Sequence, residues 1–262
     1  MYAVNKAVFE IDDDKNHIYL YLTNNDKLTS KHIKIISMYS SLDIDNYDHI
    51  IDNLPNSLIK LHLGISFNQI VDNLPDSLKI LIIGKFNEQD KFNKPVNNLP
   101  HLLEVLHIGC NFNYKLNNLP NNLIELKLGN KFNQTLNNLP CSLKILLIGS
   151  EFNNNLDDLP NGLEKLIIGG LKFSEFDQLL NNLPNSLKYL EIKINKKIQI
   201  MCPYSIEELH IYGDFEIIGK IHHCIKKINI GSKFIDKIPT EYQKKCPLKC
   251  FSSVKKLKNT MD

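Results

Sequence analysis

The sequence predicts a β-rich repeat solenoid, a stack of about 9–10 short parallel strands with irregular, mostly non-helical return segments. Two observations favour this fold class. A phrase built around Leu-Pro returns about every 20 residues, and alanine, the strongest helix former, occurs only at positions 3 and 7 of 262 residues. Asparagine, in contrast, occurs 33 times, which suits turns and opposes long helices. A helical bundle is therefore not expected.

Leu-Pro marks the start of each repeat. The pairs stand at residues 54–55, 74–75, 99–100, 119–120, 139–140, 159–160 and 183–184. Two altered copies follow at 202–215 and 222–234, so nine strand segments are expected, with a poorly marked earlier one near 31–37. Insertions interrupt the period around 85–91 and 171–175, and the turn at 193–197 has lost its glycine and phenylalanine.

The repeat that starts at Leu119 shows what each position contributes. Pro120 has a fixed φ and no amide donor, so it suits the second place of a type I turn. The pattern Leu-x-x-Leu-x-Leu then indicates a short strand with one buried face, and Gly129 ends it through a positive φ or a close backbone approach. Six apolar positions of the repeat are expected to face the same way: Leu123, Leu126, Leu128, Phe132, Leu136 and Leu139.

One turn cannot bury this apolar face alone, so identical turns must stack in register, about 4.8 Å apart. Phenylalanine then forms a column, in which either Phe173 or Phe176 follows Phe67, Phe92, Phe112, Phe132 and Phe152. The asparagine after each phenylalanine forms a parallel column, which we expect to satisfy loop backbone groups or neighbouring amides: Asn68, Asn93, Asn113, Asn133 and Asn153.

The ends of the chain differ from the repeats, since a solenoid must cover its terminal core. Residues 1–50 are expected to form an N-terminal cap with a hairpin of 7–11 and 17–22, and 30–39 to form a short helix or an irregular strand. Residues 51–239 are assigned to the solenoid. Residues 240–262 are expected to form a C-terminal cap and a mobile, lysine-rich tail.

The phrase LPxSLxxLxIGxxFN resembles the FNIP repeat, a relative of the leucine-rich repeat found in amoebae and in the giant viruses that infect them. The resemblance extends over residues 52–237. Many family members carry an F-box, so it implies a substrate-recognition adaptor in ubiquitin ligation as an alternative function. No F-box match is visible in this sequence.

Charge and hydropathy point away from several classes of partner. The net charge is +2 and all 31 basic residues are lysine, so the arginine fork that grips phosphate and guanine is missing and nucleic acid is not an expected partner. The apolar runs fall short of the roughly 20 residues of a membrane span, and no secretory signal is visible. We expect an intracellular protein with reduced cysteines, in the cytoplasm (of the host, if viral).

Motifs for catalysis and for cofactor binding are not found. The sequence has no phosphate-cradling glycine loop, nucleophile elbow or His-Glu-x-x-His, so we expect neither enzyme activity nor a cofactor. An enzyme site within residues 1–50 or the tail is the alternative with least support. Zinc could be held by Cys202, His222, His223 and Cys224, but no paired Cys-x-x-Cys is present, and cysteine is an ordinary core residue.

The open face of the strands carries the candidate binding residues. At the second place after the leading leucine, lysine and glutamate alternate from Lys144 onward, which we interpret as a structural charge ladder. The third and fifth places carry an apolar stripe, which reflects either strand propensity or a protein-binding patch. The second interpretation predicts a non-catalytic protein–protein interaction module that binds its partner through Ile80, Ile82, Val105, His107, Ile145, Leu147, Ile167 and Tyr189.

Overall fold

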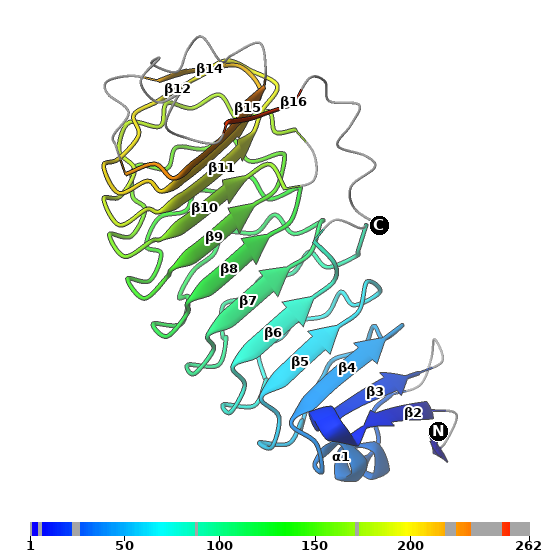
Figure 1. The fold of residues 1–262 in the computed structure, drawn as a ribbon. Helices are drawn as coiled ribbons and strands as arrows, with labels where there is room; N and C mark the ends of the chain where they lie inside the picture. Colours follow the sequence, from blue (N-terminus) through cyan, green and yellow to red (C-terminus); the bar gives the residue numbers. More distant parts are fainter. Residues whose placement is uncertain are drawn as a thin grey trace.

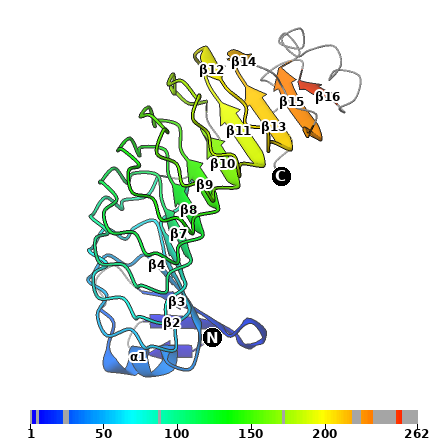
Figure 2. The ribbon, with the colours of Figure 1, turned by 90° about the vertical axis from the view of Figure 1, so that its left-hand side faces the viewer.

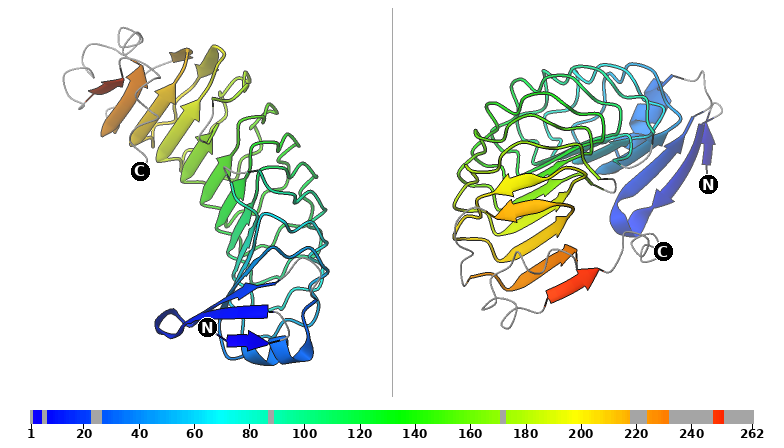
Figure 3. Two further views of the ribbon diagram at one scale, coloured as in Figure 1. Left: turned by 90° about the vertical axis from the view of Figure 1, so that its right-hand side faces the viewer. Right: turned by 90° about the horizontal axis from the view of Figure 1, so that it is seen from above.

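A computed structural model of the protein describes residues 2–4, 7–22, 27–86, 89–170, 173–217, 224–231 and 248–251. Each turn of the chain contributes one strand to a continuous sheet, and the stack of turns bends into an arc (Figure 1). The sheet lines the inner, concave side of this arc, and the return segments form the outer side (Figures 2 and 3). The predicted solenoid is thereby confirmed.

Within the described residues, the main sheet has 14 strands in the order β1-β2-β3-β4-β5-β6-β7-β8-β9-β10-β11-β13-β15-β16. The pairs β1/β2 and β2/β3 are antiparallel, and every later pair is parallel. A separate two-stranded sheet pairs β12 with β14. The strands are β1 Tyr2–Val4, β2 Ala7–Asp12, β3 His17–Tyr21, β4 Ser41–Asp45, β5 Lys60–Leu63, β6 Ile80–Ile83, β7 Val105–Ile108, β8 Glu125–Leu128, β9 Ile145–Ile148, β10 Lys165–Ile168, β11 Tyr189–Lys193, β12 Ile198–Ile200, β13 Glu208–Tyr212, β14 Phe215–Ile217, β15 Lys227–Gly231 and β16 Leu248–Phe251.

The nine strands predicted from the repeats are β5 to β11, β13 and β15, and they pair in register. The predicted hairpin is also confirmed, as β2 and β3 joined by the short 3₁₀ helix η1 (Asp13–Lys15). Residues 30–39, for which the sequence predicted either a short helix or an irregular strand, contain the helix α1 (Ser30–Ile36). Strands β3 and β4 extend the parallel stack into residues that carry no repeat phrase.

A column of stacked phenylalanine rings fills the core between the sheet and the return segments. Neighbouring rings lie 6.0–6.2 Å apart between centroids and are within 16° of parallel. Phe176 takes the last place in this column, whereas Phe173 is half-buried outside it. The six apolar positions predicted from one repeat are all buried or nearly so, with Leu139 the most exposed.

The asparagine column joins each turn to the next through the backbone. Each side-chain Oδ1 accepts a hydrogen bond from the N–H at the same place in the following turn, which satisfies a loop donor as predicted. The distances are 2.9 Å from Asn68 to Asn93, 3.0 Å from Asn93 to Asn113, 2.9 Å from Asn113 to Asn133, 2.9 Å from Asn133 to Asn153 and 3.1 Å from Asn153 to Asp177.

Replacing Asn133 with alanine is expected to lower the free energy of unfolding by about 0.5–1.5 kcal/mol, the net value of one hydrogen bond. The N–H of Asn153 then loses its acceptor from the preceding turn. Urea-induced unfolding followed by circular dichroism measures the change. Asn155→Ala is the matched control, because Asn155 is an exposed asparagine outside this column. If both variants lost the same free energy of unfolding, the hydrogen bonds of the asparagine column would not be a source of stability.

The turn after Leu-Pro differs in one respect from its prediction. The N–H of Leu123 donates to the carbonyl oxygen of Pro120 at 3.1 Å, so proline occupies the first place of the turn and not the second. That place uses only a carbonyl, so the missing N–H of proline costs nothing there. In three of the repeats the asparagine before Leu-Pro has a positive φ, of 61° at Asn53, 55° at Asn118 and 61° at Asn138.

Gly129 allows a close approach between consecutive turns. A Cβ atom at this position would overlap the backbone of Gly109 and Cys110 in the preceding turn. The sequence predicted either a positive φ or a close backbone approach at this glycine. Because its φ is not positive, the close approach is the reason that applies.

The first insertion places a carboxylate inside the solenoid. Asp90 is 4% exposed and accepts hydrogen bonds from the N–H groups of Phe92 (3.2 Å), Cys110 (2.5 Å) and Asn111 (3.4 Å). Burial nevertheless raises the pKa of Asp90 above its ordinary value, against the opposing effect of these donors. The carboxylate thus joins the enlarged turn to its regular neighbour.

Candidate functional site

The concave face presents two rows of half-buried side chains, because alternate strand residues point away from the core. Strand pairing in register aligns the members of each row across β5 to β11. The first row is Lys60, Ile80, Val105, Glu125, Ile145, Lys165 and Tyr189, and the second is His62, Ile82, His107, Lys127, Leu147, Ile167 and Glu191.

All eight residues predicted for partner binding lie on this face, but their apolar members do not form a continuous stripe. Strand β8 interrupts it with Glu125 and Lys127, whose charged groups lie 2.6 Å apart. The result is two apolar clusters on the same face. The first cluster is Ile80, Ile82 and Val105, and the second is Ile145, Leu147 and Ile167.

Polar contacts hold His107 at the border of β8. Its Nε2 lies 2.8 Å from Oε1 of Glu125. Burial and the nearby charge of Lys127 lower the pKa of His107, so the neutral imidazole is favoured at neutral pH. His107 thus contributes a polar, uncharged surface beside the first apolar cluster.

Tyr189 closes the second cluster through a dense set of contacts. Its ring stacks on His210 at 5.1 Å, its hydroxyl donates to Glu191 at 2.5 Å, and Nζ of Lys165 lies 4.4 Å from the ring centroid. Burial, followed by the hydrogen bond to Glu191 and then by its charge, raises the pKa of Tyr189. The phenol therefore remains protonated and its ring is fixed in place.

The charge ladder predicted beside these rows is present. Ion pairs join neighbouring turns at its second-place positions, where solvent exposure weakens each of them. The pairs are Lys79–Glu104 at 2.7 Å, Lys144–Glu164 at 3.4 Å, Lys188–Glu164 at 2.8 Å and Lys226–Glu207 at 2.7 Å. This supports the structural interpretation of the ladder.

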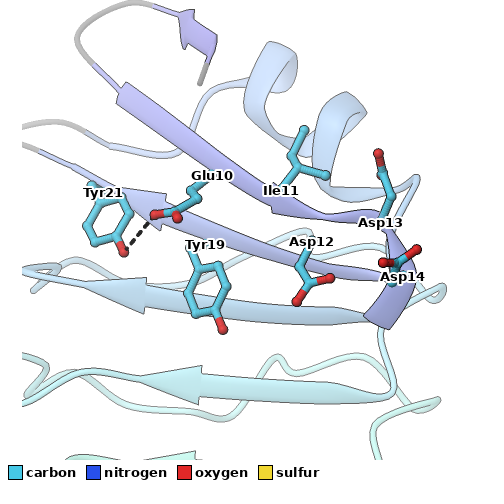
Figure 4. Close-up of a pocket in the computed structure, with 7 residues that line it drawn as sticks. All are labelled: Glu10, Ile11, Asp12, Asp13, Asp14, Tyr19 and Tyr21. Carbon is cyan, nitrogen blue, oxygen red and sulfur yellow. Dashed lines mark hydrogen bonds between the residues drawn. The ribbon is translucent and has the colours of Figure 1, made fainter.

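A hollow at the N-terminal end of the concave face was missed from the sequence. It has a volume of about 550 Å³ and lies over the β2–β3 hairpin (Figure 4). Tyr19 and Tyr21 share a face of β3, and the hydroxyl of Tyr21 donates to Glu10 at 3.5 Å. The alternation of tyrosine along 17–21 is the signal that could have revealed it. The lining residues are Glu10, Ile11, Asp12, Asp13, Asp14, Tyr19 and Tyr21.

A serine, two histidines and an aspartate meet where β3, β4 and β5 pair. Ser41 Oγ lies 3.1 Å from Nδ1 of His17, and Asp43 lies 3.4 Å from both His17 Nε2 and His62 Nδ1. Burial lowers the pKa of His17. Ser41 and His17 are only 8% and 7% exposed, so a substrate carbonyl could not reach the hydroxyl without displacing its neighbours. We interpret this cluster as a structural junction of the three strands.

The zinc candidate is only partly described. Cys202 is buried, and burial raises the pKa of its thiol to about 12. Cys224 is exposed, whereas His222 and His223 lie outside the described residues. In the portion of the chain that the structure describes, no three His, Cys, Asp or Glu residues are arranged to hold a metal ion.

Comparison with protein families identifies the repeat. Residues 47–86 match the family model described as FNIP Repeat. This part of the chain carries the FNIP repeat. This match covers β5, β6 and the Leu-Pro turns that precede them, where the phenylalanine and asparagine columns begin.

A solved structure of a leucine-rich-repeat protein resembles this solenoid. CroV588, a circular leucine-rich-repeat protein from a giant virus, matches with 33% identity and a TM-score of 0.64 over 74% of this chain and 30% of that chain. YopM from Yersinia enterocolitica matches with 19% identity and a TM-score of 0.44 over 80% and 53%. The FNIP solenoid thus spans less than a third of CroV588. No curated protein matched the sequence.

Leucine-rich-repeat solenoids are typical protein–protein interaction modules and generally act as scaffolds without catalysis. Helix α1 has seven residues. Across the described ranges, no helix combines the length and the apolar character needed to cross a bilayer.

Proposed function

We propose that the FNIP solenoid is a non-catalytic module that binds a protein partner through the concave sheet face. The observation that carries this proposal is the pair of apolar clusters, Ile80 with Ile82 and Val105, and Ile145 with Leu147 and Ile167. Both clusters are half-exposed and lie on a concave surface that can surround a convex partner. Adaptor activity in ubiquitin ligation gains no support from the described elements, and we do not propose it.

The half-buried state of these side chains suits binding without aggregation. Each apolar residue is flanked along its row by a polar one, such as His62 beside Ile82 and Lys165 beside Ile145. A partner that displaces water from both clusters gains the hydrophobic contribution of about 25 cal/mol per Å² of apolar area. The charged strand β8 between the clusters then fixes the register of the partner.

The triple substitution Ile82→Ser, Leu147→Ser and Ile167→Ser is expected to weaken partner capture at least tenfold, because it removes apolar area from both clusters. Protein captured from the native cell by the unmodified chain is identified by mass spectrometry. The purified partner is then titrated against each variant, and circular dichroism verifies that the variants remain folded.

The matched control changes two isoleucines and one leucine on other exposed positions. Ile50, Ile70 and Leu179 are 52%, 43% and 43% exposed and belong to return segments on the outer side. Serine at these positions should leave capture unchanged. Undiminished capture by the concave-face variant, or equal loss by the control, would contradict the proposal.

A further inference from the structure

We propose that the N-terminal half of the concave face binds a basic–aliphatic segment of the partner protein, an inference that rests on the proposed function. A lysine or arginine of the segment lies against the acidic–aromatic surface, which we define by its residues below. An aliphatic side chain of the same segment lies on the first apolar cluster. The acidic–aromatic surface consists of Glu10, Asp12, Tyr19, Tyr21, Asp43 and Asp45.

Strand register places these six side chains on one patch. Glu10 pairs with Tyr19 across β2 and β3, and Tyr21 pairs with Asp45 across β3 and β4. Two phenol rings set among carboxylates are a chemistry that favours cations, through cation–π contact and ion pairing together. The hairpin turn adds two further acidic residues, Asp13 and Asp14, which line the same hollow (Figure 4).

The cations near the patch leave two of its four carboxylates without an ionic partner. Lys15 pairs with Asp12 at 2.8 Å and His62 lies 3.4 Å from Asp43, whereas Glu10 and Asp45 take part in no ion pair among the described residues. The concave positions of β2, β3 and β4 carry no lysine, and burial lowers the pKa of His17, which favours its neutral imidazole. After burial, the charges of Glu10 and Asp45 contribute most to raising the pKa of Tyr21, as a negative local field requires.

The distance to the first apolar cluster fixes the spacing of the ligand. Tyr19, Asp43, His62 and Ile82 are aligned across β3, β4, β5 and β6. Three strand steps of about 4.8 Å give about 14 Å, and an extended chain covers this distance in about four residues. The segment therefore has an aliphatic residue about four positions from its basic one and crosses the strands along the row.

Charge selects a protein segment over two other classes of partner. Nucleic acids and anionic lipid surfaces carry negative charge, so the acidic–aromatic surface repels them. A basic peptide gains from the same field, and its contact is weakened by salt. The arrangement thus favours one occupant among the common macromolecular ligands.

The test uses labelled synthetic peptides and the full chain in fluorescence anisotropy. The probe is Lys-Lys-Ser-Gly-Ser-Ile-Ser-Ile, and two control peptides replace both lysines by glutamate or both isoleucines by serine. We expect the probe to bind at least tenfold more tightly than either control, and more weakly at high salt. Equal binding of the lysine and glutamate peptides would overturn the inference.

Protein variants locate the site. Glu10→Gln with Asp45→Asn removes two charges without changing side-chain shape and is expected to raise the Kd of the probe about tenfold. The matched control, Glu151→Gln with Asp158→Asn, alters exposed residues of return segments and should leave the Kd unchanged. Equal Kd values for the two double variants would also overturn the inference.

The two proposals fail separately. If the captured natural partner is lost by the concave-face serine variant while the peptides show no preference for lysine, the interaction function stands and the partner chemistry is wrong. If the natural partner still binds the serine variant, the interaction function itself is wrong.

Discussion

Replacing Phe132 with alanine is expected to lower the free energy of unfolding by about 3–5 kcal/mol, the range found for large-to-small changes at buried aromatic residues. Phe132 has 0% exposure and stacks between Phe112 and Phe152, with centroid distances of 6.0 and 6.2 Å. Its removal opens a cavity and breaks two ring contacts at once. Urea-induced unfolding, followed by circular dichroism, measures the loss.

Phe132→Leu serves as the matched variant. Leucine keeps much of the buried apolar volume and loses mainly the two ring contacts, so a loss of about 1–3 kcal/mol is expected. The difference in the free energy of unfolding between the alanine and leucine variants measures the cost of the cavity. An alanine variant as stable as the leucine variant would show that the phenylalanine column does not pack as tightly as described.

Asp90→Ala is expected to produce the second largest loss, about 2–4 kcal/mol, since each buried donor left without an acceptor costs about 1–3 kcal/mol. The N–H groups of Phe92, Cys110 and Asn111 all lose their acceptor in this variant. Gly109 lies against the carboxylate, where a Cβ would overlap it, so the carboxylate is closely packed by the neighbouring turn. Asp72→Ala, which changes an exposed aspartate, should be nearly neutral.

The same residue gives the stability a dependence on pH. Because burial raises the pKa of Asp90 in the folded state, the folded chain binds a proton more strongly than the unfolded chain. Its contribution to stability therefore falls as pH rises from the ordinary value of 3.8 through the raised folded value. Asp90→Asn cannot titrate, so the stability of the wild type relative to this variant should decline over that window. A constant difference across a pH series of unfolding curves would contradict this.

The repeated part of the fold was predictable because each turn repeats the same physical solution. The alternation of Leu126 and Leu128 predicts a strand with one buried face. The recurrence of Phe132 and Asn133 at the same place in other turns predicts the phenylalanine and asparagine columns. The interior carboxylate was not predictable, since the insertion that contains Asp90 breaks the period on which the alignment depends. Strand β4 was also missed, because Ser41–Asp45 carries no Leu-Pro phrase.

The candidate site was predictable only where it follows the repeat. Alternation placed Ile82, Leu147 and Ile167 on the open face, but the gap that β8 makes between the two clusters required the strand register. The acidic–aromatic surface depends on pairing between β2, β3 and β4. Such pairing brings Tyr21 beside Glu10 and Asp45, residues whose spacing along the chain shows no common pattern.

The hydrogen bonds of the asparagine column connect a turn only with the turns immediately before and after it. Cooperativity in such a chain is therefore local, and opening is expected to begin at an end and to advance one coil at a time. Amide protons of β8 and β9 should consequently exchange with solvent more slowly than those of β3 or β13. Unfolding of a turn in the middle of the solenoid leaves two shorter stacks, each of which stays folded while its own turns remain in contact.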